Sequence, residues 1–542
     1  MVVDLSELIK TYDVRGVTPD PLSTEVARAI GAAFAQVVVW PDFLANDYDD
    51  DAAASADAGD RPRVVIGQDM RESGVELVAA FTEGLTSAGV DVELIGLCST
   101  DGLYYAAASR GIPGAMFTAS HNPAQYNGIK MCRSEARPVG ETTGLAAIRE
   151  LAGKLLAAEV PESLTKPAPF EAFDTETVTD QSERSQLRPI QPDKGTIDYA
   201  RSSGQGLPPS FSGPGRVTTS DDLPNYARFL RSLVDLSQIR PLKVVIDAGN
   251  GMAGLTVPAV LGTAAGLPEL PLEIIPLYFE LDGTFPNHEA NPLDPANLVD
   301  LQAAVIANEA DIGLAFDGDA DRCFVVDEKG NPISGSVITL LVGLRELDRD
   351  KELNPDSEPV IVHNLVTSRA VPELLAAHGA RPLRTRVGHS LIKAQMAESG
   401  AVFGGEHSGH FYYRDFWFAD SGMLTALHVL AALGGNDGMP LSDMADWYQP
   451  YFQSGEINSK VKDQTAVRDA IVDIYRKSYP NAQVDYFDGV TFSNWEHHPR
   501  WWFNLRVSNT EPYLRLNVEA EDEDIMEKVR DDVLALIARY AD

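Results

Sequence analysis

The stretch Thr118-Ala119-Ser120-His121-Asn122-Pro123 follows the apolar run Gly114-Ala115-Met116-Phe117, which predicts the end of a buried strand. A serine on the loop that leaves a buried strand can project into a functional site. Pro123 has no backbone N–H, so strand pairing is expected to stop just after the serine. Lys130 follows closely enough in sequence to face the same site. A hydroxyl beside a cation suits the acceptance of a phosphoryl group, and the simpler alternative is that Ser120 only caps a helix.

A second apolar run, Ile312-Gly313-Leu314-Ala315-Phe316, precedes Asp317-Gly318-Asp319-Ala320-Asp321-Arg322. If the backbone turns after this predicted strand, the alternate carboxylates converge on one point. Such a cluster offers the oxygen ligands that Mg²⁺ prefers and leaves room for water or phosphate oxygens. Arg322 adds a planar guanidinium that matches phosphate. The segment therefore indicates a magnesium site that also contacts phosphate.

The same segment fits part of a calcium-binding EF-hand loop. Asp317, Asp319 and Asp321 would take its first, third and fifth positions, and Glu328 its twelfth. However, Arg322 stands where the sharp turn of that loop requires glycine, and the preceding run is predicted to be a strand. A calcium loop and a plain acidic surface turn are the alternatives to the magnesium site.

Two later segments carry groups that bind sugars and phosphates. In Gly404-Gly405-Glu406-His407-Ser408-Gly409-His410, an extended loop would aim Glu406 and Ser408 together at sugar hydroxyls. In Arg506-Val507-Ser508-Asn509-Thr510-Glu511-Pro512, with Arg515 beyond it, side chains and backbone N–H groups form a dense set of donors to phosphate oxygens. The simpler alternatives are a Gly-rich turn with a buried histidine, and a Ser/Thr turn beside a surface arginine.

Together, and in this order along the chain, the four segments resemble the motifs of the α-D-phosphohexomutase family, most closely those of its mannose-phosphate members. The resemblance runs from Thr11-Tyr12-Asp13-Val14-Arg15-Gly16 to the Arg506 segment. It implies four domains around a central cleft, three of them related α/β domains and the last α+β. The implied domains are residues 1–160 (phosphoserine loop), 221–335 (metal loop), 336–455 (sugar loop) and 456–542 (phosphate loop). Residues 161–220 are expected to form a Pro/Ser/Gly-rich insert or linker.

The resemblance also implies a role for each motif residue. Ser120 would carry the phosphoryl group, and Lys130 would exchange the proton of the reacting sugar hydroxyl. Mg²⁺ would be held by Asp317, Asp319 and Asp321 and would also touch the Ser120 phosphate. Arg322 would lie near the transferring phosphate. His389 or water would handle a second proton, because residues 364–369 lack a lysine that some relatives carry.

The substrate is assigned in the same way. Tyr12 and Arg15 would line the cleft, and Glu406 and Ser408 would hold sugar hydroxyls. The phosphate that does not react would be bound by Arg506, Ser508, Asn509, Thr510 and Arg515.

The implied activity is that of an intramolecular phosphotransferase. It would interconvert mannose 1-phosphate and mannose 6-phosphate through a hexose 1,6-bisphosphate, which would also be the activator. Glu406 and Ser408 would contact hydroxyls common to glucose and mannose, so they do not separate the two sugars. The sequence Ser508-Asn509-Thr510 resembles the mannose and dual-specificity members, which favours mannose with glucose as a second substrate. Glucose-specific and glucosamine-specific mutases are the alternatives, and a non-catalytic calcium- or sugar-binding protein is the alternative from another class.

Two further motifs point to other functions. A serine hydrolase that uses Ser120 and His121 is disfavoured, because neighbours on an extended loop point apart and the G-x-S-x-G elbow is missing from the sequence. Gly249-Asn250-Gly251-Met252-Ala253-Gly254 matches the dinucleotide pattern after a predicted strand. Asp247 just before it would oppose a pyrophosphate, so a tight strand-to-helix turn is expected.

Composition sets the wider frame. The 542 residues are too many for one core, and the net charge of −36, from 44 basic and 80 acidic residues, disfavours nucleic acids and anionic membranes as partners. A phosphosugar enzyme of this charge would need a local positive pocket, expected from Arg15, Lys130, Arg322, His389, Arg506 and Arg515. The few, scattered cysteines indicate a reducing compartment. The N-terminal residues lack a signal-peptide pattern, so a cytoplasmic location is expected.

Secondary structure is predicted from alternating patterns. Apolar runs at residues 64–66, 92–95, 244–246 and 360–362 predict strands, and helical spacing at 74–88 and 297–309 predicts helices between them. A strand at 514–518 and a closing helix at 523–539 indicate an α+β ending. The acidic segment 42–60 and most of 161–220 are expected to be inserted loops.

Overall fold

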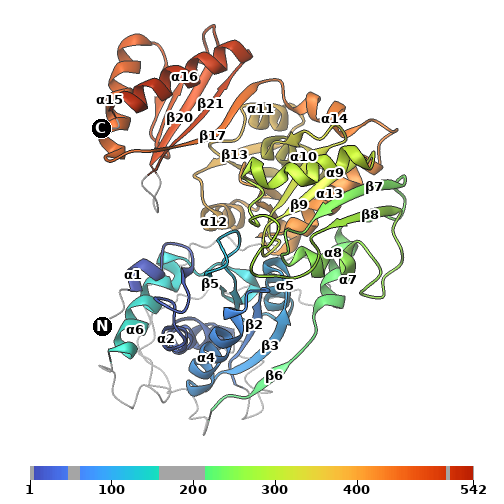
Figure 1. Cartoon of the computed structure of the whole chain (residues 1–542), viewed down its shortest axis with the longest axis vertical. Helices are drawn as coiled ribbons and strands as arrows, with labels where there is room; N and C mark the ends of the chain where they lie inside the picture. The colour runs from blue at the N-terminus through green and yellow to red at the C-terminus, as the bar shows by residue number, and fades with distance from the viewer. Residues whose placement is uncertain (1–4, 47–60, 158–213, 508–512, 541–542) are drawn as a thin grey trace. The chain divides into compact units, whose positions relative to one another are not determined.

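The computed structural model describes residues 5–46, 61–157, 214–507 and 513–540 (Figure 1). They form two compact units. The first comprises Met1–Pro332, Met396–Gly400 and Gly409–Gly438, and the second comprises Ile333–Gln395, Ala401–Ser408 and Met439–Asp542. The alternation of strands and helices expected from the sequence is confirmed in both.

The first unit opens with a six-stranded mixed sheet in the order β1-β5-β4-β2-β3-β6. Its strands are β1 (Val14–Val17), β2 (Arg63–Gln68), β3 (Asp91–Leu97), β4 (Gly114–Phe117), β5 (Tyr126–Cys132) and β6 (Val217–Thr219). The accompanying helices are α1 (Leu5–Leu8), α2 (Thr24–Phe34), α3 (Trp40–Asn46), α4 (Ser73–Ser87), α5 (Thr100–Arg110) and α6 (Ala146–Leu156). Strand β4 runs parallel to β2 and antiparallel to β5, so the loop between β4 and β5 leaves from the middle of the sheet.

The core beneath β4 explains why this strand is apolar along its whole length. All its residues are buried, and the ring of Phe117 meets Phe81 of α4 edge-on at a centroid distance of 5.3 Å. Phe81 in turn lies 6.0 Å from Phe34 of α2. Aromatic burial of this kind is worth several kcal/mol and fixes the end of β4, from which the loop containing Ser120 starts.

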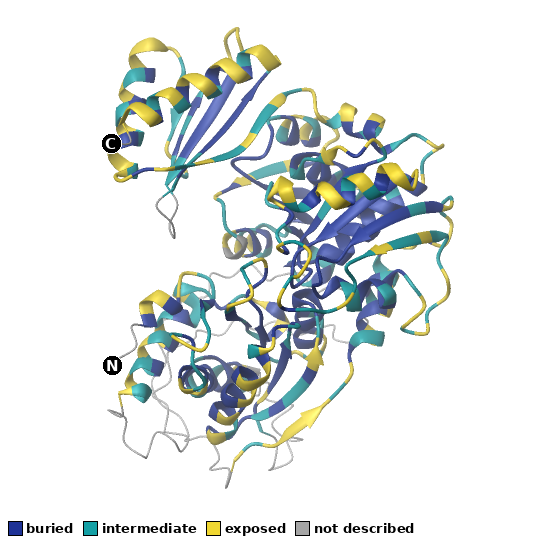
Figure 2. Ribbon diagram, in the orientation of Figure 1, coloured by how far each residue is buried: buried dark blue, intermediate teal, exposed yellow. Residues whose placement is uncertain are grey.

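Two parts of the predicted inserts are ordered elements. Residues 217–219, expected in the linker, form β6, which pairs with β3 and is exposed at all three residues (Figure 2). Asp42, at the start of the predicted acidic loop, lies in α3 and makes a buried ion pair with Arg133. Residues 47–60 and 161–213 of the predicted inserts lie outside the described residues.

The second sheet of the first unit has the order β11-β10-β9-β7-β8. Its strands are β7 (Leu242–Asp247), β8 (Leu272–Leu277), β9 (Ile312–Phe316), β10 (Cys323–Asp327) and β11 (Pro332–Ile333), and its helices are α7 (Leu223–Leu233), α8 (Ala253–Val260) and α9 (Val299–Ala307). Helix α13 (Gly422–Gly434) and the hairpin of β15 (Phe411–Tyr413) and β16 (Ala419–Asp420) complete the unit.

Two sequence alternatives are settled by this sheet. Strands β9 and β10 are antiparallel neighbours, so the segment from Asp317 to Arg322 is a hairpin loop and not the helix–loop–helix of an EF-hand. The glycine-rich segment after β7 is a tight turn into α8, and the Gly249 N–H donates to Asp247 Oδ1 at 2.8 Å. That N–H is therefore engaged by a carboxylate and does not face a pyrophosphate.

The second unit begins with parallel strands β12 (Val360–Asn364), β13 (Arg381–Thr385) and β14 (Phe403–Gly405), with β12 in the centre. Its helices are α10 (Gly335–Leu353), α11 (Ala370–Ala377) and α14 (Leu441–Tyr448), together with α12 (His389–Ser399) as far as Gln395. The predicted strand at 360–362 is thus confirmed within β12.

The C-terminal part is an antiparallel sheet in the order β17-β21-β20-β19-β18. Its strands are β17 (Phe452–Lys460), β18 (Gln483–Asp485), β19 (Val490–Ser493), β20 (Trp501–Val507) and β21 (Tyr513–Ala520). Helices α15 (Gln464–Ser478) and α16 (Glu523–Tyr540) cover one face of it (Figure 1). Tyr475 packs edge-on against Trp501 and Phe503 in the core between helix and sheet. The predicted α+β ending is confirmed.

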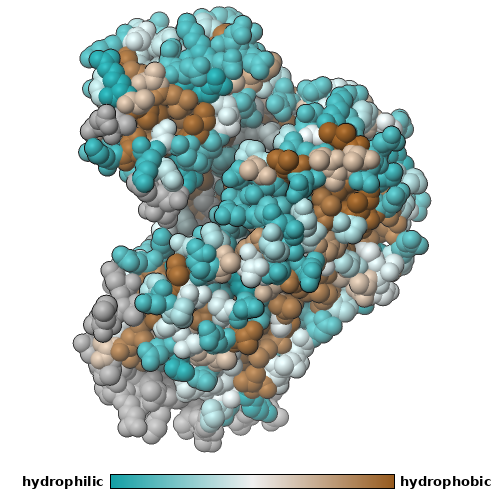
Figure 3. Space-filling model, viewed as in Figure 1, coloured by the Kyte–Doolittle hydropathy of each residue, from teal (hydrophilic) through white to brown (hydrophobic). Residues whose placement is uncertain are grey.

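The face in Figure 3 is mostly hydrophilic, with several smaller hydrophobic areas among the hydrophilic residues. None of the helices within the described ranges combines the length and apolarity that a membrane crossing requires.

A buried carboxyl joins three helices of the first unit. Asp101, near the start of α5, accepts hydrogen bonds from Ser99, from the Tyr226 hydroxyl of α7 at 2.7 Å and from Ser421 Oγ, the N-cap of α13, at 2.5 Å. Its side chain is fully buried, and this burial raises the pKa of Asp101 to about 6.

The raised pKa of the buried Asp101 carboxyl predicts that the stability of the protein depends on pH. A carboxyl whose pKa rises from 3.8 to about 6 on folding holds its proton more tightly in the native state, so its contribution is complete below about pH 4 and is lost as the pH rises through 6. We expect the free energy of unfolding of the wild type, relative to Asp101→Asn, to fall by about 2–3 kcal/mol between pH 4 and 7. Urea unfolding at a series of pH values measures this difference, and a difference independent of pH would contradict the assignment.

Candidate active site

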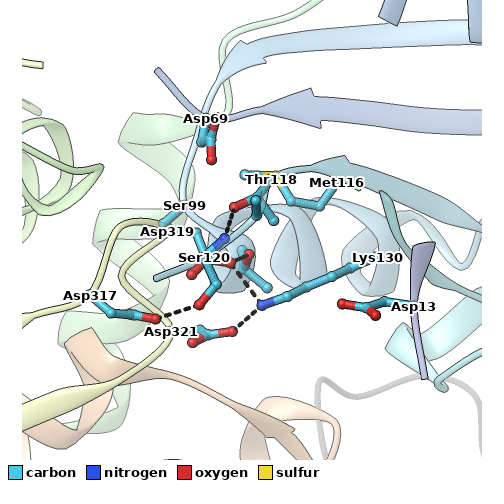
Figure 4. Close-up of polar contacts among 12 residues, drawn as sticks. Asp13, Asp69, Ser99, Met116, Thr118, Ser120, Lys130, Asp317, Asp319 and Asp321 are labelled. Atoms are coloured by element: carbon cyan, nitrogen blue, oxygen red, sulfur yellow. Dashed lines mark hydrogen bonds and ion pairs between the residues drawn. The ribbon is translucent and has the colours of Figure 1, made fainter. Parts of the chain in front are cut away.

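Ser120 lies in a strained loop directly after β4. Its φ is +48°, a region that residues with a Cβ rarely adopt, and its N–H donates to Thr118 Oγ1 at 2.8 Å. Its side-chain Oγ donates to Asp317 Oδ2 at 2.7 Å (Figure 4). Backbone strain held by specific contacts is typical of functional positions. The structure thus joins two motifs that lie far apart in the sequence.

The prediction that Ser120 and His121 point apart is wrong. Because the backbone at Ser120 is left-handed and not extended, Ser120 Oγ lies 3.3 Å from His121 Nδ1. The same nitrogen lies 2.7 Å from an Arg322 guanidinium nitrogen, from which it accepts a hydrogen bond. Burial, together with the charges of Arg322 and Arg15, holds the pKa of His121 well below its usual value. His121 is therefore a poor general base for Ser120, and a hydrolase remains disfavoured for this electrostatic reason.

The loop between β9 and β10 gathers three carboxylates. One ligand oxygen from each of Asp317, Asp319 and Asp321 lies within 4.8 Å of the others, and all three side chains are buried. The Oδ1 atoms of Asp319 and Asp321 are buried without a hydrogen-bond partner. Carboxylate oxygens left over in this way fit the ligand set of a hard divalent cation. The predicted convergence of the triad is confirmed.

Gly318 allows the two loops to touch. A Cβ built on Gly318 would lie 2.4 Å from the carbonyl oxygen of Ser120, far inside van der Waals contact. Only a residue without a side chain fits between the carboxylates and the serine loop, which is the segment 118–125 between β4 and β5.

Lys130 of β5 lies between two members of the triad. Its Nζ is 2.7 Å from Asp319 Oδ2 and 2.5 Å from Asp321 Oδ2. Although burial opposes the charge, these carboxylates hold the pKa of Lys130 well above its usual value, and Lys130 lowers the pKa of Asp319 against the effect of burial. Asp317 differs, because burial and the charges of the other two carboxylates raise its pKa to about 7.

The remaining predicted residues of this unit are also engaged. Arg15 of β1 donates to the Ala119 carbonyl at 2.7 Å and pairs with Asp13 at 2.5 Å. Arg322 pairs with Asp317 at 2.9 Å. Tyr12 is half-buried beside β1. The expected positive pocket is thus, in this unit, a set of cations that each have a carboxylate partner.

His410 ends the glycine-rich segment that contains Glu406 and Ser408, and the sequence indicates no role for it. Its Nδ1 lies 2.9 Å from Asp420 Oδ2 and 3.9 Å from Asp321 Oδ1. Against the effect of burial, these carboxylates raise the pKa of His410. A histidine in the quoted glycine-rich segment was the only sequence signal for it.

Arg71, in the loop after β2, was missed entirely. Its guanidinium is buried and donates to the carbonyls of Ser120, Asn122, Pro123 and Tyr126 at 2.6–2.9 Å, and its Nε pairs with Asp69 at 3.2 Å. One arginine therefore fixes the path of the whole serine loop. Burial lowers the pKa of Arg71 and raises that of Asp69, so their attraction does not fully replace lost hydration.

In the second unit, the sugar loop departs from the expected shape. Glu406 follows β14 and is buried, but residues 407–408 form a turn, so Glu406 and Ser408 do not lie on one extended segment. Asn364 Nδ2, at the end of β12, donates to Glu406 Oε2 at 3.3 Å and lies 3.2 Å from His407 Nδ1.

The predicted phosphate residues are described in part. Arg506 of β20 and Arg515 of β21 both contact the carboxylate of Glu456, at 3.2 and 3.1 Å. Ser508, Asn509 and Thr510 lie outside the described residues, as does the side chain of His389.

The hydrogen bonds from Arg71 to the serine loop predict that replacing Arg71 lowers the free energy of unfolding strongly. Arg71→Met leaves Asp69 buried without its partner and several carbonyls without a donor, which should cost about 3–5 kcal/mol of unfolding free energy. Arg28→Met is the control, because Arg28 and its partner Glu83 are exposed and such pairs contribute below about 1 kcal/mol. Denaturant unfolding of both variants is the measurement, and equal small effects would show that Arg71 does not hold the loop.

Comparison with known proteins agrees with this geometry. Models of the four phosphoglucomutase/phosphomannomutase domains match the chain: alpha/beta/alpha domain I at residues 50–157, domain II at 224–330, domain III at 335–451 and the C-terminal domain at 456–536. A phosphohexose mutase of Xanthomonas campestris pv. campestris is 34% identical over 98% of both chains. A phosphomannomutase/phosphoglucomutase of Pseudomonas aeruginosa is 32% identical over 97% of this chain and 94% of its own.

Solved structures show the same architecture. A phosphoglucomutase/phosphomannomutase family protein of Burkholderia thailandensis superposes with a TM-score of 0.71 at 27% identity, covering 98% of this chain and 97% of that one. A putative phosphomannomutase of Thermus thermophilus, at 19% identity, shares the fold with a TM-score of 0.70 over 99% of this chain and 100% of its own. The four matched domains and full-length relatives above 30% identity show that this chain belongs to the phosphoglucomutase/phosphomannomutase family of phosphohexomutases.

Proposed function

We propose that the chain interconverts mannose 1-phosphate and mannose 6-phosphate, with the glucose phosphates as second substrates, through a phosphoserine at Ser120. The observation that carries the proposal is the hydrogen bond from Ser120 Oγ to Asp317 Oδ2, which sets a nucleophilic oxygen against the carboxylate triad. The relatives that match this chain over nearly its whole length include phosphomannomutases and a phosphomannomutase/phosphoglucomutase. Mannose is favoured over glucosamine because the sequence Ser508-Asn509-Thr510 resembles that of the mannose and dual-specificity members of the family.

Two phosphoryl transfers make up the cycle. The phosphoryl group leaves Ser120 Oγ for the free hydroxyl of a hexose phosphate, so a serine O–P bond breaks and a sugar O–P bond forms. The resulting 1,6-bisphosphate turns around, and its other phosphate returns to Ser120. Asp317, Asp319 and Asp321 would hold Mg²⁺, which supplies charge neutralisation for the transferring group. Arg322, paired with Asp317, is positioned to contact the same phosphoryl oxygens.

Proton transfer is assigned to Lys130 and His410. The carboxylates around Lys130 keep its amine protonated, so in this arrangement it can donate a proton to the oxygen that a phosphoryl group leaves. Lys130 could accept a proton only if Asp319 and Asp321 paired with another cation, because their charges would then no longer hold the pKa of Lys130 high. His410 replaces His389 in our assignment of the second group, because His410 contacts Asp321 of the triad.

Recognition of the substrate is assigned to the remaining motif residues. Tyr12 and Arg15 would line the serine side, and Glu406 and Ser408 would hold sugar hydroxyls. Arg506, Ser508, Asn509, Thr510 and Arg515 would bind the phosphate that does not react. The bisphosphate serves as the activator because it can phosphorylate Ser120.

Turnover by the wild type and by Ser120→Ala tests the proposal. We expect conversion of mannose 1-phosphate and, with lower kcat/KM, of glucose 1-phosphate, in the presence of Mg²⁺ and a catalytic amount of glucose 1,6-bisphosphate. Ser120→Ala should lose at least about 10³-fold in kcat, since it lacks the group that carries phosphate. A coupled assay of 6-phosphate formation measures both.

The control is Ser109→Ala, which removes a hydroxyl on α5 that donates a hydrogen bond to the Ala106 carbonyl of the same helix. It should keep wild-type kcat. Activity of the wild type on glucosamine phosphates alone would overturn the sugar assignment, and full activity of Ser120→Ala would overturn the phosphoserine.

A further inference from the structure

Glu456 occupies an unusual place on the C-terminal sheet. Strand β17 has an irregular register with β21 between Gln453 and Glu456, and Gly455 between them has a φ of +68°. Such a bulge re-aims the side chain that follows it. Here it brings the Glu456 carboxylate to Arg506 and Arg515, with Oε2 3.2 Å from the first and Oε1 3.1 Å from the second.

The two arginines need a counter-charge. Arg506 and Arg515 are direct cross-strand partners in β20 and β21, and like charges at such positions repel. Glu456 contacts one guanidinium with each carboxylate oxygen and so offsets this repulsion. With Glu456 ionised, the three side chains carry a net charge of about +1 instead of +2.

Glu456 is ionised at neutral pH. Burial alone would raise its pKa, but the hydrogen bond and charge of His407, with the charges of Arg515 and Arg506, lower the pKa of Glu456 to about 2. The carboxylate therefore competes with any anion for the same guanidinium donors.

The contact also reaches the sugar loop. His407 Nε2 lies 3.8 Å from Glu456 Oε2, and Asn364 lies within hydrogen-bond distance of both His407 and Glu406. The residues assigned to the sugar and those assigned to the phosphate are thus linked through Glu456.

We propose that Glu456 is an internal counter-ion that limits how tightly Arg506 and Arg515 hold phosphate. This role rests on the proposed function of the two arginines. A bisphosphate that has to turn around must first release the phosphate that they hold. A carboxylate already between the guanidinium groups replaces the departing anion and makes that release reversible.

Binding of inorganic phosphate tests the proposal by isothermal titration calorimetry. Glu456→Gln keeps the size of the side chain and removes its charge, and it should lower the Kd for phosphate by about tenfold. Glu456→Ser, in which water can fill the space, should shift the Kd in the same direction. In turnover, Glu456→Gln should lower both KM and kcat, because tighter holding of phosphate slows its release.

Two controls localise the effect. Glu527→Gln removes the same charge from the half-exposed Glu527 of α16, in the same sheet-and-helix assembly, and should leave the Kd within about twofold. Glu456→Gln combined with Arg506→Met should lose the gain, since the freed guanidinium is then missing.

An unchanged or higher Kd in Glu456→Gln would overturn the counter-ion role and leave Glu456 as a residue that only orients the arginines. This outcome differs from failure of the proposed function. A wild type that turns over no hexose phosphate contradicts the mutase assignment, whereas an active wild type with unchanged phosphate affinity in the variant contradicts only the role of Glu456.

Discussion

Lys130, between the buried carboxylates of Asp319 and Asp321, is the contact on which the first unit depends. Buried charges lose several kcal/mol of hydration each, and only close, well-oriented partners return it. The ammonium offsets repulsion between carboxylates that Gly318 brings up against the serine loop. It also ties β5 to the loop after β9, so the position of Ser120 relative to the triad follows from electrostatics as much as from apolar packing.

Pairing of a cation with a nearby carboxylate occurs in both units. The chain carries a net charge of −36, and the sequence alone suggested that a phosphosugar site would need a local positive pocket. The structure shows another solution, in which Arg15, Arg322 and Arg506 each contact a carboxylate of their own unit. Cations held in this way are pre-oriented without a strong field of their own. A phosphate must then compete for them, which suits a site that binds and releases the same group in every cycle.

Much of the fold could be predicted because its strands are short apolar runs that end at chemistry-bearing loops, as at Phe117 and Phe316. The triad could be predicted because its three alternate carboxylates come directly after a buried apolar strand, where a turn of the backbone brings them together. Arg71 was missed because its partners are backbone carbonyls that no residue type reveals. The Ser120–His121 contact was missed because it depends on a positive φ at a serine, and β6 because its three residues are exposed and gain order only by pairing with β3.

The most direct test of the account is the site of phosphorylation. After incubation with glucose 1,6-bisphosphate and Mg²⁺, peptide mass mapping should place one phosphoryl group on Ser120. Transfer should stop when a chelator removes the divalent cation, because the carboxylates beside Ser120 then repel the incoming phosphate. Phosphate on another residue, or equal labelling of Ser120 in the presence of chelator, would contradict the coupling of the serine loop to the carboxylate triad.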